Sequence, residues 1–267
     1  MDTTSATLNI RRSPNQTFVL YLKEMKYEFL KNLRIPRYSA SVIILPLMFY
    51  VLFGLFMGRQ TIGNTSTAAY LIATYGTFGV LGASLFGTAA SLASERGLGW
   101  IQVKKASPMP PFAYFVAKFF MGIMFSFIVV SLLLVLGVAF GGVRMPLQNM
   151  IQLVGTLVAG SVPFCAMGLA IGYFMGPNSA PAVINLIYLP LSFASGLWVP
   201  FQFLPKVVKQ IALYLPPYHL AQLALRIIGF NGNETNWTHW KVLIGFTLLC
   251  LGVARFGFQK DEEKMYG

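Results

Sequence analysis

Long apolar runs dominate the hydrophobic pattern of this chain and leave only short polar stretches between them. Six runs are long enough to cross a membrane as helices: residues 38–58, 70–94, 115–140, 151–175, 180–199 and 240–256. A spanning helix needs about 20 mostly apolar residues. Prolines inside several runs are compatible with spans, because neighbouring helices satisfy the freed backbone groups. The pattern predicts an all-α membrane protein with six transmembrane helices in one domain, residues 1–267.

The stretch 200–237 interrupts this pattern between the fifth and sixth runs. Prolines and cations divide it, and no apolar window of 18 residues survives there. We expect short re-entrant helices on the outer face before the last span. An ordinary interfacial loop is the alternative.

The polar stretch before the first run has an amphipathic pattern. Its lysines and arginines lie mainly off one apolar line, formed at helical spacing by Phe18, Leu22, Met25, Phe29 and Leu33. A basic amphipathic helix of this kind lies in the headgroup plane of a membrane. We therefore expect an interfacial helix over residues 18–35, ended by Pro36.

Composition strengthens the membrane assignment. Charged residues make up only 10% of the chain and the mean hydropathy is +0.64, too little charge to cover a water-facing surface. The formal net charge of +12 comes mostly from residues outside the apolar runs, which indicates topology signals and anionic headgroups rather than nucleic acid. With six spans, 14 Lys and Arg fall on one side and 6 on the other. The N- and C-termini are therefore expected in the cytoplasm.

The predicted spans lack the residues that chemistry inside a membrane needs. Apart from Lys241 and Arg255 at the two ends of the last run, the only Asp, Glu, Lys, Arg or His in the spans is Lys118, near a boundary where its ammonium could snorkel to water. The histidines His219 and His239 are too far apart in sequence to suggest a metal pair. No GxxxxGK[ST] phosphate loop is present. We expect no catalytic residue, metal or cofactor in this chain, so a source of energy must come from another protein.

Small residues form a stripe on the second predicted span. Gly79, Ala83, Gly87 and Ser91 recur every four residues, and such stripes allow helix backbones to approach closely in lipid. The pattern leaves two interpretations open, packing within one chain and packing across a dimer.

The segment 95–110, after the second span, combines charge, glycine and proline at defined spacing. Together with the outer motifs Trp198–Pro200, Leu204–Pro205 and Leu215–His219, it resembles the permease subunits of the ABC-2 family of ATP-binding-cassette exporters. The family loop, E-[RK]-x-x-G-x-x-x-x-L-x-x-x-P, is matched at Glu95, Arg96, Gly99 and Pro108. It departs at Trp100, where Thr is common, and at Val103 and Lys104, around the usual Leu.

The resemblance implies an assembly of two permeases, expected to be identical, with two ATPase subunits that bind ATP and Mg. The segment 95–110 would be a coupling loop that meets the ATPase, with Glu95 and Arg96 as charged anchors on that partner. Helix 18–35, including Glu28, would be a connecting helix, and the transport path would be lined by spans one, two and five. The coupling residues would be Glu95, Arg96, Gly99, Trp100, Lys104 and Pro108, and an outer gate would comprise Phe201, Pro205, Pro216, Pro217 and Tyr218.

The function expected from the resemblance is export of a hydrophobic or amphipathic compound, a drug, lipid or peptide, from the inner membrane of a bacterium. Spans without fixed charge favour such substrates over small ions. Two alternatives remain open: export of a lipid-linked polysaccharide, and a membrane channel or scaffold that works without an ATPase. An intramembrane enzyme is disfavoured because the spans lack a nucleophile–base set or metal ligands.

Overall fold

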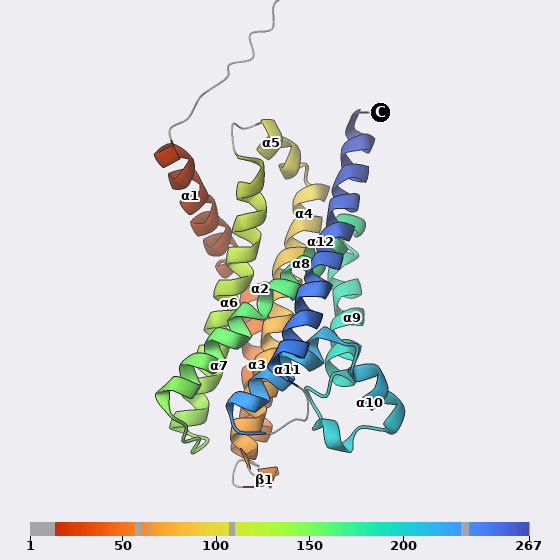
Figure 1. Ribbon diagram of the computed structural model, residues 1–267. Coiled ribbons are helices and arrows are strands. Elements are labelled where there is room, and N and C mark those ends of the chain that lie inside the picture. Colours follow the sequence, from red (N-terminus) through yellow and green to blue (C-terminus); the bar gives the residue numbers. More distant parts are fainter. Residues whose placement is uncertain (1–13, 57–59, 63–64, 107–109, 231–234, 267) are drawn as a thin grey trace, which may run out of the picture.

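The computed structural model describes residues 14–56, 60–62, 65–106, 110–230 and 235–266. Helices run between two ends of the molecule (Figure 1). We call one of them the α5 end, where α1 (Pro14–Leu33), α5 (Trp100–Ala106) and the last turns of α12 (Asn236–Tyr266) lie. The hairpin end holds β1 (Thr61–Ile62) and β2 (Thr65–Ser66), which pair antiparallel. Both ends of the described chain therefore lie on the same side of the molecule.

Five helical stretches of the described chain are long and apolar enough to cross a membrane. They cover Tyr38–Leu55, Thr67–Gly97, Phe112–Ala139, Leu147–Phe174 and Asn236–Asp261. The fifth expected span, 180–199, is represented by α9 (Ala180–Ala194), which has 15 residues. At 1.5 Å per residue such a helix reaches about 23 Å, less than the roughly 30 Å of a hydrocarbon core. The fold is that of a helical membrane protein, and the count of six spans stays a prediction.

Three of these stretches change helix type or direction along their length. The first consists of α2 (Pro36–Phe49) and the π-helical turn η1 (Tyr50–Leu55). The fourth bends at Gly160, where α7 (Leu147–Ala159) gives way to α8 (Ser161–Phe174) and Leu220 fills the place a Cβ would take. The second stretch is made of α3 (Thr67–Leu85), the π-helical turn η2 (Phe86–Ala90) and α4 (Ser91–Gly97). The third stretch, by contrast, lies within the single helix α6 (Pro111–Ala139).

The second stretch is the centre of the molecule. Every residue of α3 is buried, and α3 packs against α2, α6, α8 and α11 (Pro216–Ile227). Its small-residue stripe faces this chain's own helices: a Cβ on Gly79 would meet Val129 and Pro46, and one on Gly87 would meet Tyr38 and Met121. The stripe is thus occupied by packing within the chain. The expectation that span two lines a path between two permeases is wrong, because α3 has no free face.

The expected outer segment 200–237 forms short helices at the hairpin end. They are η3 (Phe201–Phe203), α10 (Lys206–Ala212) and α11. α10 is largely exposed, whereas α11 is buried among α3, α7 and α12. Of the expected gate residues, Pro216, Pro217 and Tyr218 are buried, and the Tyr218 ring lies 5.0 Å from that of Phe201, while Pro205 is exposed. A re-entrant path for these helices stays a prediction.

Candidate functional site

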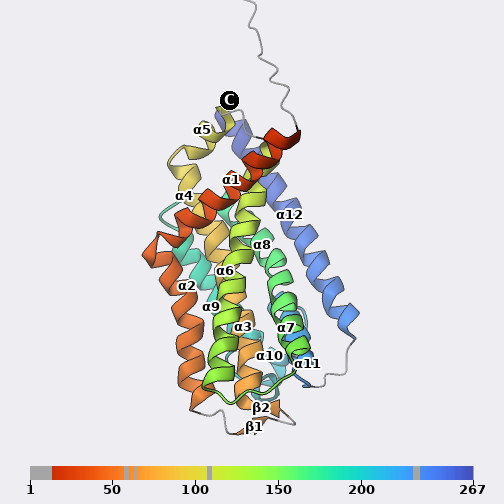
Figure 2. The ribbon, with the colours of Figure 1, turned by 90° about the vertical axis from the view of Figure 1, so that its left-hand side faces the viewer.

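α1 lies obliquely across the α5 end, against α6 (Figure 2). Its buried residues are Glu28 and Asn32, whereas Phe18 is 64% exposed and Leu33 is 41% exposed. The apolar line predicted from sequence therefore does not define the face that α1 turns toward the protein. A polar face is buried instead because Glu28 finds charged partners on other helices.

These partners form a cluster of six side chains from α1, α4 and α6, which we call the Glu95 cluster; its centre is buried, and Lys31 at its edge is 41% exposed. At its centre the Nζ of Lys118 donates to Glu28 Oε1 at 2.6 Å, to Glu95 Oε1 at 2.8 Å and to the hydroxyl of Ser91. Tyr114 donates from its hydroxyl to Glu95 Oε2 at 2.7 Å. The members are Glu28, Lys31, Ser91, Glu95, Tyr114 and Lys118.

The charges of the Glu95 cluster balance. Two carboxylates face two ammonium groups, since Lys31 also pairs with Glu28 at 2.7 Å and with Glu95. The side chain of Lys118 is fully buried, so the expectation that it snorkels to water is wrong. An isolated buried ammonium would be very costly, and paired, hydrogen-bonded geometry is what makes it tolerable.

The pKa values of the two α1 members follow from this geometry. Burial alone would raise the pKa of Glu28, but the ammonium groups of Lys118 and Lys31 outweigh it and hold that pKa below its ordinary value. Burial alone would lower the pKa of Lys31, but the carboxylates of Glu28 and Glu95 raise it. Both groups are therefore charged over the physiological range.

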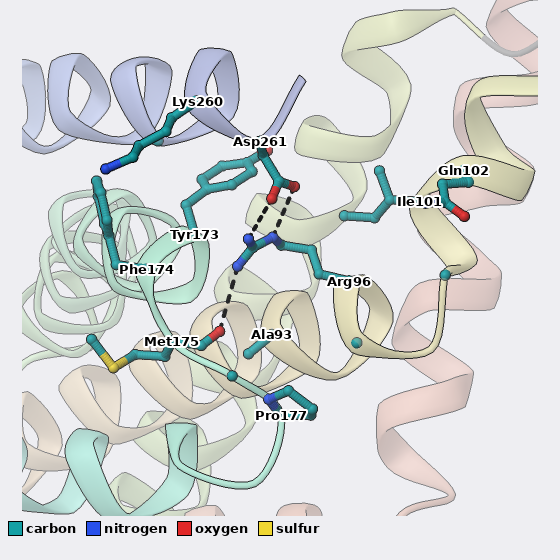
Figure 3. Close-up of a pocket in the computed structure, with 14 residues that line it drawn as sticks. Ala93, Arg96, Ile101, Gln102, Tyr173, Phe174, Met175, Pro177, Lys260 and Asp261 are labelled. Atoms are coloured by element: carbon teal, nitrogen blue, oxygen red, sulfur yellow. Dashed lines mark hydrogen bonds and ion pairs between the residues drawn. The ribbon is translucent and has the colours of Figure 1, made fainter. Parts of the chain in front are cut away.

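Arg96 forms a second junction, beside the first. Its guanidinium makes a two-bond contact with Asp261 of α12, at 3.0 and 2.5 Å (Figure 3). It also donates to the carbonyl oxygen of Gly172 at 3.0 Å. A longer bond of 3.4 Å reaches the carbonyl oxygen of Met175. These carbonyls belong to the carboxyl end of α8, where a cation also meets the negative end of the helix dipole. Arg96 thus joins α4 to α8 and α12.

The tip beyond these junctions is apolar and exposed. Gly99 turns the chain between α4 and α5 with a φ of +72°, a conformation that favours glycine. Around it Leu98 is 73% exposed, Trp100 is 54% exposed and Val103 is 59% exposed. Pro108, the last predicted coupling residue, lies outside the described residues. Leu98, Trp100 and Val103 are called the α5 tip below.

Lys104 ties α5 back to the other helices. Its Nζ pairs with Glu24 of α1 and lies 4.8 Å from the centre of the Tyr114 ring. Glu95, Arg96 and Lys104 are all engaged within the chain, and the role of Glu95 and Arg96 as anchors on a partner stays a prediction. Their partners lie on four helices that only folding brings to α4 and α5.

Sequence reasoning overlooked Tyr114 and Asp261 and treated Lys118 as a boundary residue. A signal was present for Lys118, because an ionisable residue inside an apolar run has a partner as a rule. No such signal existed for Asp261, which sits in a polar tail 165 residues after Arg96.

A buried histidine pair lies at the hairpin end. The Nδ1 atoms of His219 and His239 are 2.8 Å apart, and His219 Nε2 lies 2.9 Å from the carbonyl oxygen of Leu213. A carbonyl only accepts, so His219 donates from Nε2, and neutral His219 accepts at Nδ1 from His239. Their separation in sequence gave no sign of this contact. Within the described residues no group of three or more His, Cys, Asp or Glu is arranged to hold a metal.

Comparison with known proteins adds independent evidence. A family model described as ABC-2 family transporter protein matches residues 61–256. YvfS of Bacillus subtilis (strain 168), a protein named as a transport permease, is 23% identical over 241 residues, 90% of this chain and 97% of YvfS. The inner membrane transport permease YhhJ of Escherichia coli (strain K12) is 30% identical over 185 residues, 63% of this chain but only 46% of YhhJ. Since the family model matches well over half of the sequence, the chain belongs to the ABC-2 family of transporter proteins.

Proposed function

We propose that this protein is the membrane subunit of an ATP-driven exporter whose ATPase is a separate chain. The family and the names of its relatives, transport permeases, support a transport subunit. In this proposal two ATPase subunits bind ATP and Mg, and the α5 end lies in the cytoplasm of a bacterial cell. A second copy of the chain completes the transporter.

The proposed docking point for the ATPase is the α5 tip. Leu98, Trp100 and Val103 present apolar side chains beyond the end of a membrane-spanning stretch. Apolar groups gathered at a water-facing end are typical of a protein contact, and an aromatic anchor such as Trp100 suits a central place in it.

The observation that carries the proposal is how firmly the tip is tied to the spans. Glu95 connects α4 to α1 and α6, and Arg96 connects it to α8 and α12. Because breaking one buried pair leaves an uncompensated charge, these contacts favour movement of the helices as a unit. Movement of a docked ATPase would therefore reach four other helices at once.

The proposed transport path lies between two copies, along spans one and five. These spans present exposed apolar side chains, among them Ile44, Leu52, Leu186 and Phe193. Where they meet α3, the rings of Phe78 and Tyr188 stack at 4.7 Å, and the buried indole N–H of Trp198 has no hydrogen-bond partner among the described residues. An apolar, aromatic boundary without charge favours a hydrophobic or amphipathic substrate, and a lipid-linked polysaccharide is the alternative.

The test is co-expression with nucleotide-binding ATPase subunits of the source organism, co-purification, and ATPase assays in lipid nanodiscs. We expect Trp100→Ala to reduce association with the ATPase. Glu95→Gln is expected to leave association intact but to reduce the stimulation of ATP hydrolysis by the permease, because Glu95 lies behind the docking surface.

The matched control is Trp237→Ala, which removes an indole that is 64% exposed at the hairpin end. It should leave both association and hydrolysis unchanged. If no nucleotide-binding subunit associates with the folded wild-type protein, the exporter proposal fails and a channel or scaffold takes its place. Equal loss of association in Trp100→Ala and Trp237→Ala would overturn the assignment of the α5 tip.

A further inference from the structure

A second feature of the α5 end is a lateral groove between α6 and α12. Its volume is about 740 Å³, within the range of roughly 300–1,000 Å³ common for small-molecule sites. α12 packs along α8, and it meets α6 through the rings of Phe258 and Phe115, whose centres are 6.3 Å apart. Phe112 is 70% exposed and Leu251 is 39% exposed, so the groove is open from the side over part of two membrane-spanning stretches.

The walls of the groove are apolar helix faces. Phe112, Phe115 and Phe119 line it from α6, and Leu251 and Phe258 line it from α12, with further apolar lining from α8. Phe112 and Phe119 are seven residues apart, which corresponds to about 10 Å along a helix. The three phenylalanines share one face of α6, and Leu251 and Phe258, also seven residues apart, share one face of α12. The groove thus runs about two turns into the apolar part of the molecule.

The end of the groove nearest α5 is cationic. Arg255 and Gln259 line it on α12, and Lys104 lines it on α5. Arg255 is exposed, and no ion pair is formed by it within the described part of the chain. Lys104 shares its charge with Glu24. Among the side chains that the structure describes, no carboxylate lines the groove, so these side chains give its polar end a net positive charge.

We propose that this groove binds an anionic phospholipid from the leaflet at the α5 end. One acyl chain would lie between the phenylalanines of α6 and Leu251, and the phosphate would meet Arg255, with Gln259 and Lys104 beside it. The charge of the groove matches an anionic headgroup, and a cation at the membrane surface contributes about 1 kcal/mol to such binding. The side opening gives lipid direct access from the bilayer.

The arrangement fits a bilayer lipid better than a soluble anion. A free phosphate would need only the cationic end, whereas most of the lining is apolar and would stay unfilled. The binding site would also lie under α5, since Ile101 and Lys104 line the same groove. This inference concerns lipid binding and does not depend on the proposed ATPase partner.

The experiment uses the full-length protein in nanodiscs with equal amounts of phosphatidylglycerol and phosphatidylcholine. The retained lipids are counted by native mass spectrometry after transfer to detergent. We expect the wild type to retain phosphatidylglycerol preferentially. Arg255→Gln should reduce that preference about fivefold, the effect of one cation at the headgroup level. Leu251→Trp, which narrows the groove, should reduce retention of both lipids.

Matched controls lie on the same helix. Lys241→Gln removes a cation at the opposite end of α12, and Leu248→Trp adds an indole at a position that is 65% exposed and outside the groove. Both should behave as the wild type. Equal effects of Arg255→Gln and Lys241→Gln, or unchanged retention in Leu251→Trp, would overturn the proposal. Since the readout is bound lipid, failure here leaves the proposed exporter function untouched, and the reverse also holds.

Discussion

The two ends of the molecule join their helices by different means. At the α5 end, ion pairs centred on Glu95, Arg96 and Lys118 connect α4 to α1, α6 and α12, and Arg96 also donates a hydrogen bond to a carbonyl of α8. Every ion pair formed among the described side chains lies at this end. At the hairpin end, a histidine pair and aromatic contacts around Tyr218 join α11 to α12 and η3.

The difference has an energetic consequence. A buried ion cluster tolerates little change, because any separation of its members leaves a charge without a partner. Neutral hydrogen bonds and ring contacts at the hairpin end cost less to rearrange. We therefore expect the α5 end to move as a unit and the hairpin end to be the more adaptable one.

The largest expected effect comes from a substitution that disrupts the Glu95 cluster at the α5 end. Lys118→Met removes the central ammonium and leaves Glu28 and Glu95 facing each other in a buried site, which should cost about 3–5 kcal/mol of stability. Thermal unfolding in detergent measures it. The control is Lys209→Met at the hairpin end, whose ammonium donates to a backbone carbonyl in an exposed place, with an expected cost of about 0.5 kcal/mol or less.

A second substitution separates charge from packing. After Lys118→Met, Glu28 and Glu95 share the single ammonium of Lys31. Adding Glu28→Gln removes one of these two carboxylates, so the double variant should be more stable than Lys118→Met alone. If the double variant is less stable by the sum of the two single effects, the cluster does not act as one electrostatic unit.

The same cluster predicts a smaller, reversible effect of pH on stability. The pKa of Glu28 is lowered, so its contribution is present above the ordinary value of 4.5 and is lost as the pH falls through the lowered value. The pKa of Lys31 is raised, so its contribution is present below the ordinary 10.5 and is lost as the pH rises through the raised value. Unfolding temperatures should stay level between these limits and fall outside them. In Glu28→Gln the acid-side fall should shrink.

The hairpin end should respond less strongly to loss of its own polar contact. His219→Leu removes the bonds to His239 and to the carbonyl of Leu213, at an expected cost of about 1–3 kcal/mol. Gln222→Leu, on the same helix and partly buried, is the matched control. A cost of His219→Leu no greater than that of Gln222→Leu in thermal unfolding would contradict a structural role for the pair.

The smallest expected effect concerns the partly exposed pair of Lys104 and Glu24, whose side chains are 26% and 21% exposed. A double-mutant cycle with Lys104→Met and Glu24→Gln should give a coupling of about 0.2–1 kcal/mol, typical of pairs near the surface. A coupling as large as that expected in the Glu95 cluster would show that this pair belongs to the buried network.

Runs of apolar residues were sufficient to predict most of the fold. Long helices occupy five of the six expected runs, because in lipid a segment must satisfy its own backbone hydrogen bonds and so becomes a helix. The amphipathic start also forms a helix, Pro14–Leu33. The family resemblance rested on local motifs and is confirmed by the match over residues 61–256.

The partners of the charged side chains were beyond the reach of sequence. Glu28 and Lys118 are 90 residues apart, Arg96 and Asp261 are 165 apart, and His219 and His239 meet across two helices. The pattern of α1 likewise gave no sign that Glu28 and Asn32 are its buried residues.

By itself, therefore, the sequence determined that the chain lies in a membrane, where its helices run, and which family it belongs to, since these depend on local hydrophobicity and short motifs. Only the tertiary structure decided that Glu95, Arg96 and Lys118 are internal junctions, and that α3 is the buried centre rather than the wall of a path. The physical reason is that a charge inside a membrane protein is tolerated only next to its counter-charge, and that neighbour is chosen by packing between distant helices.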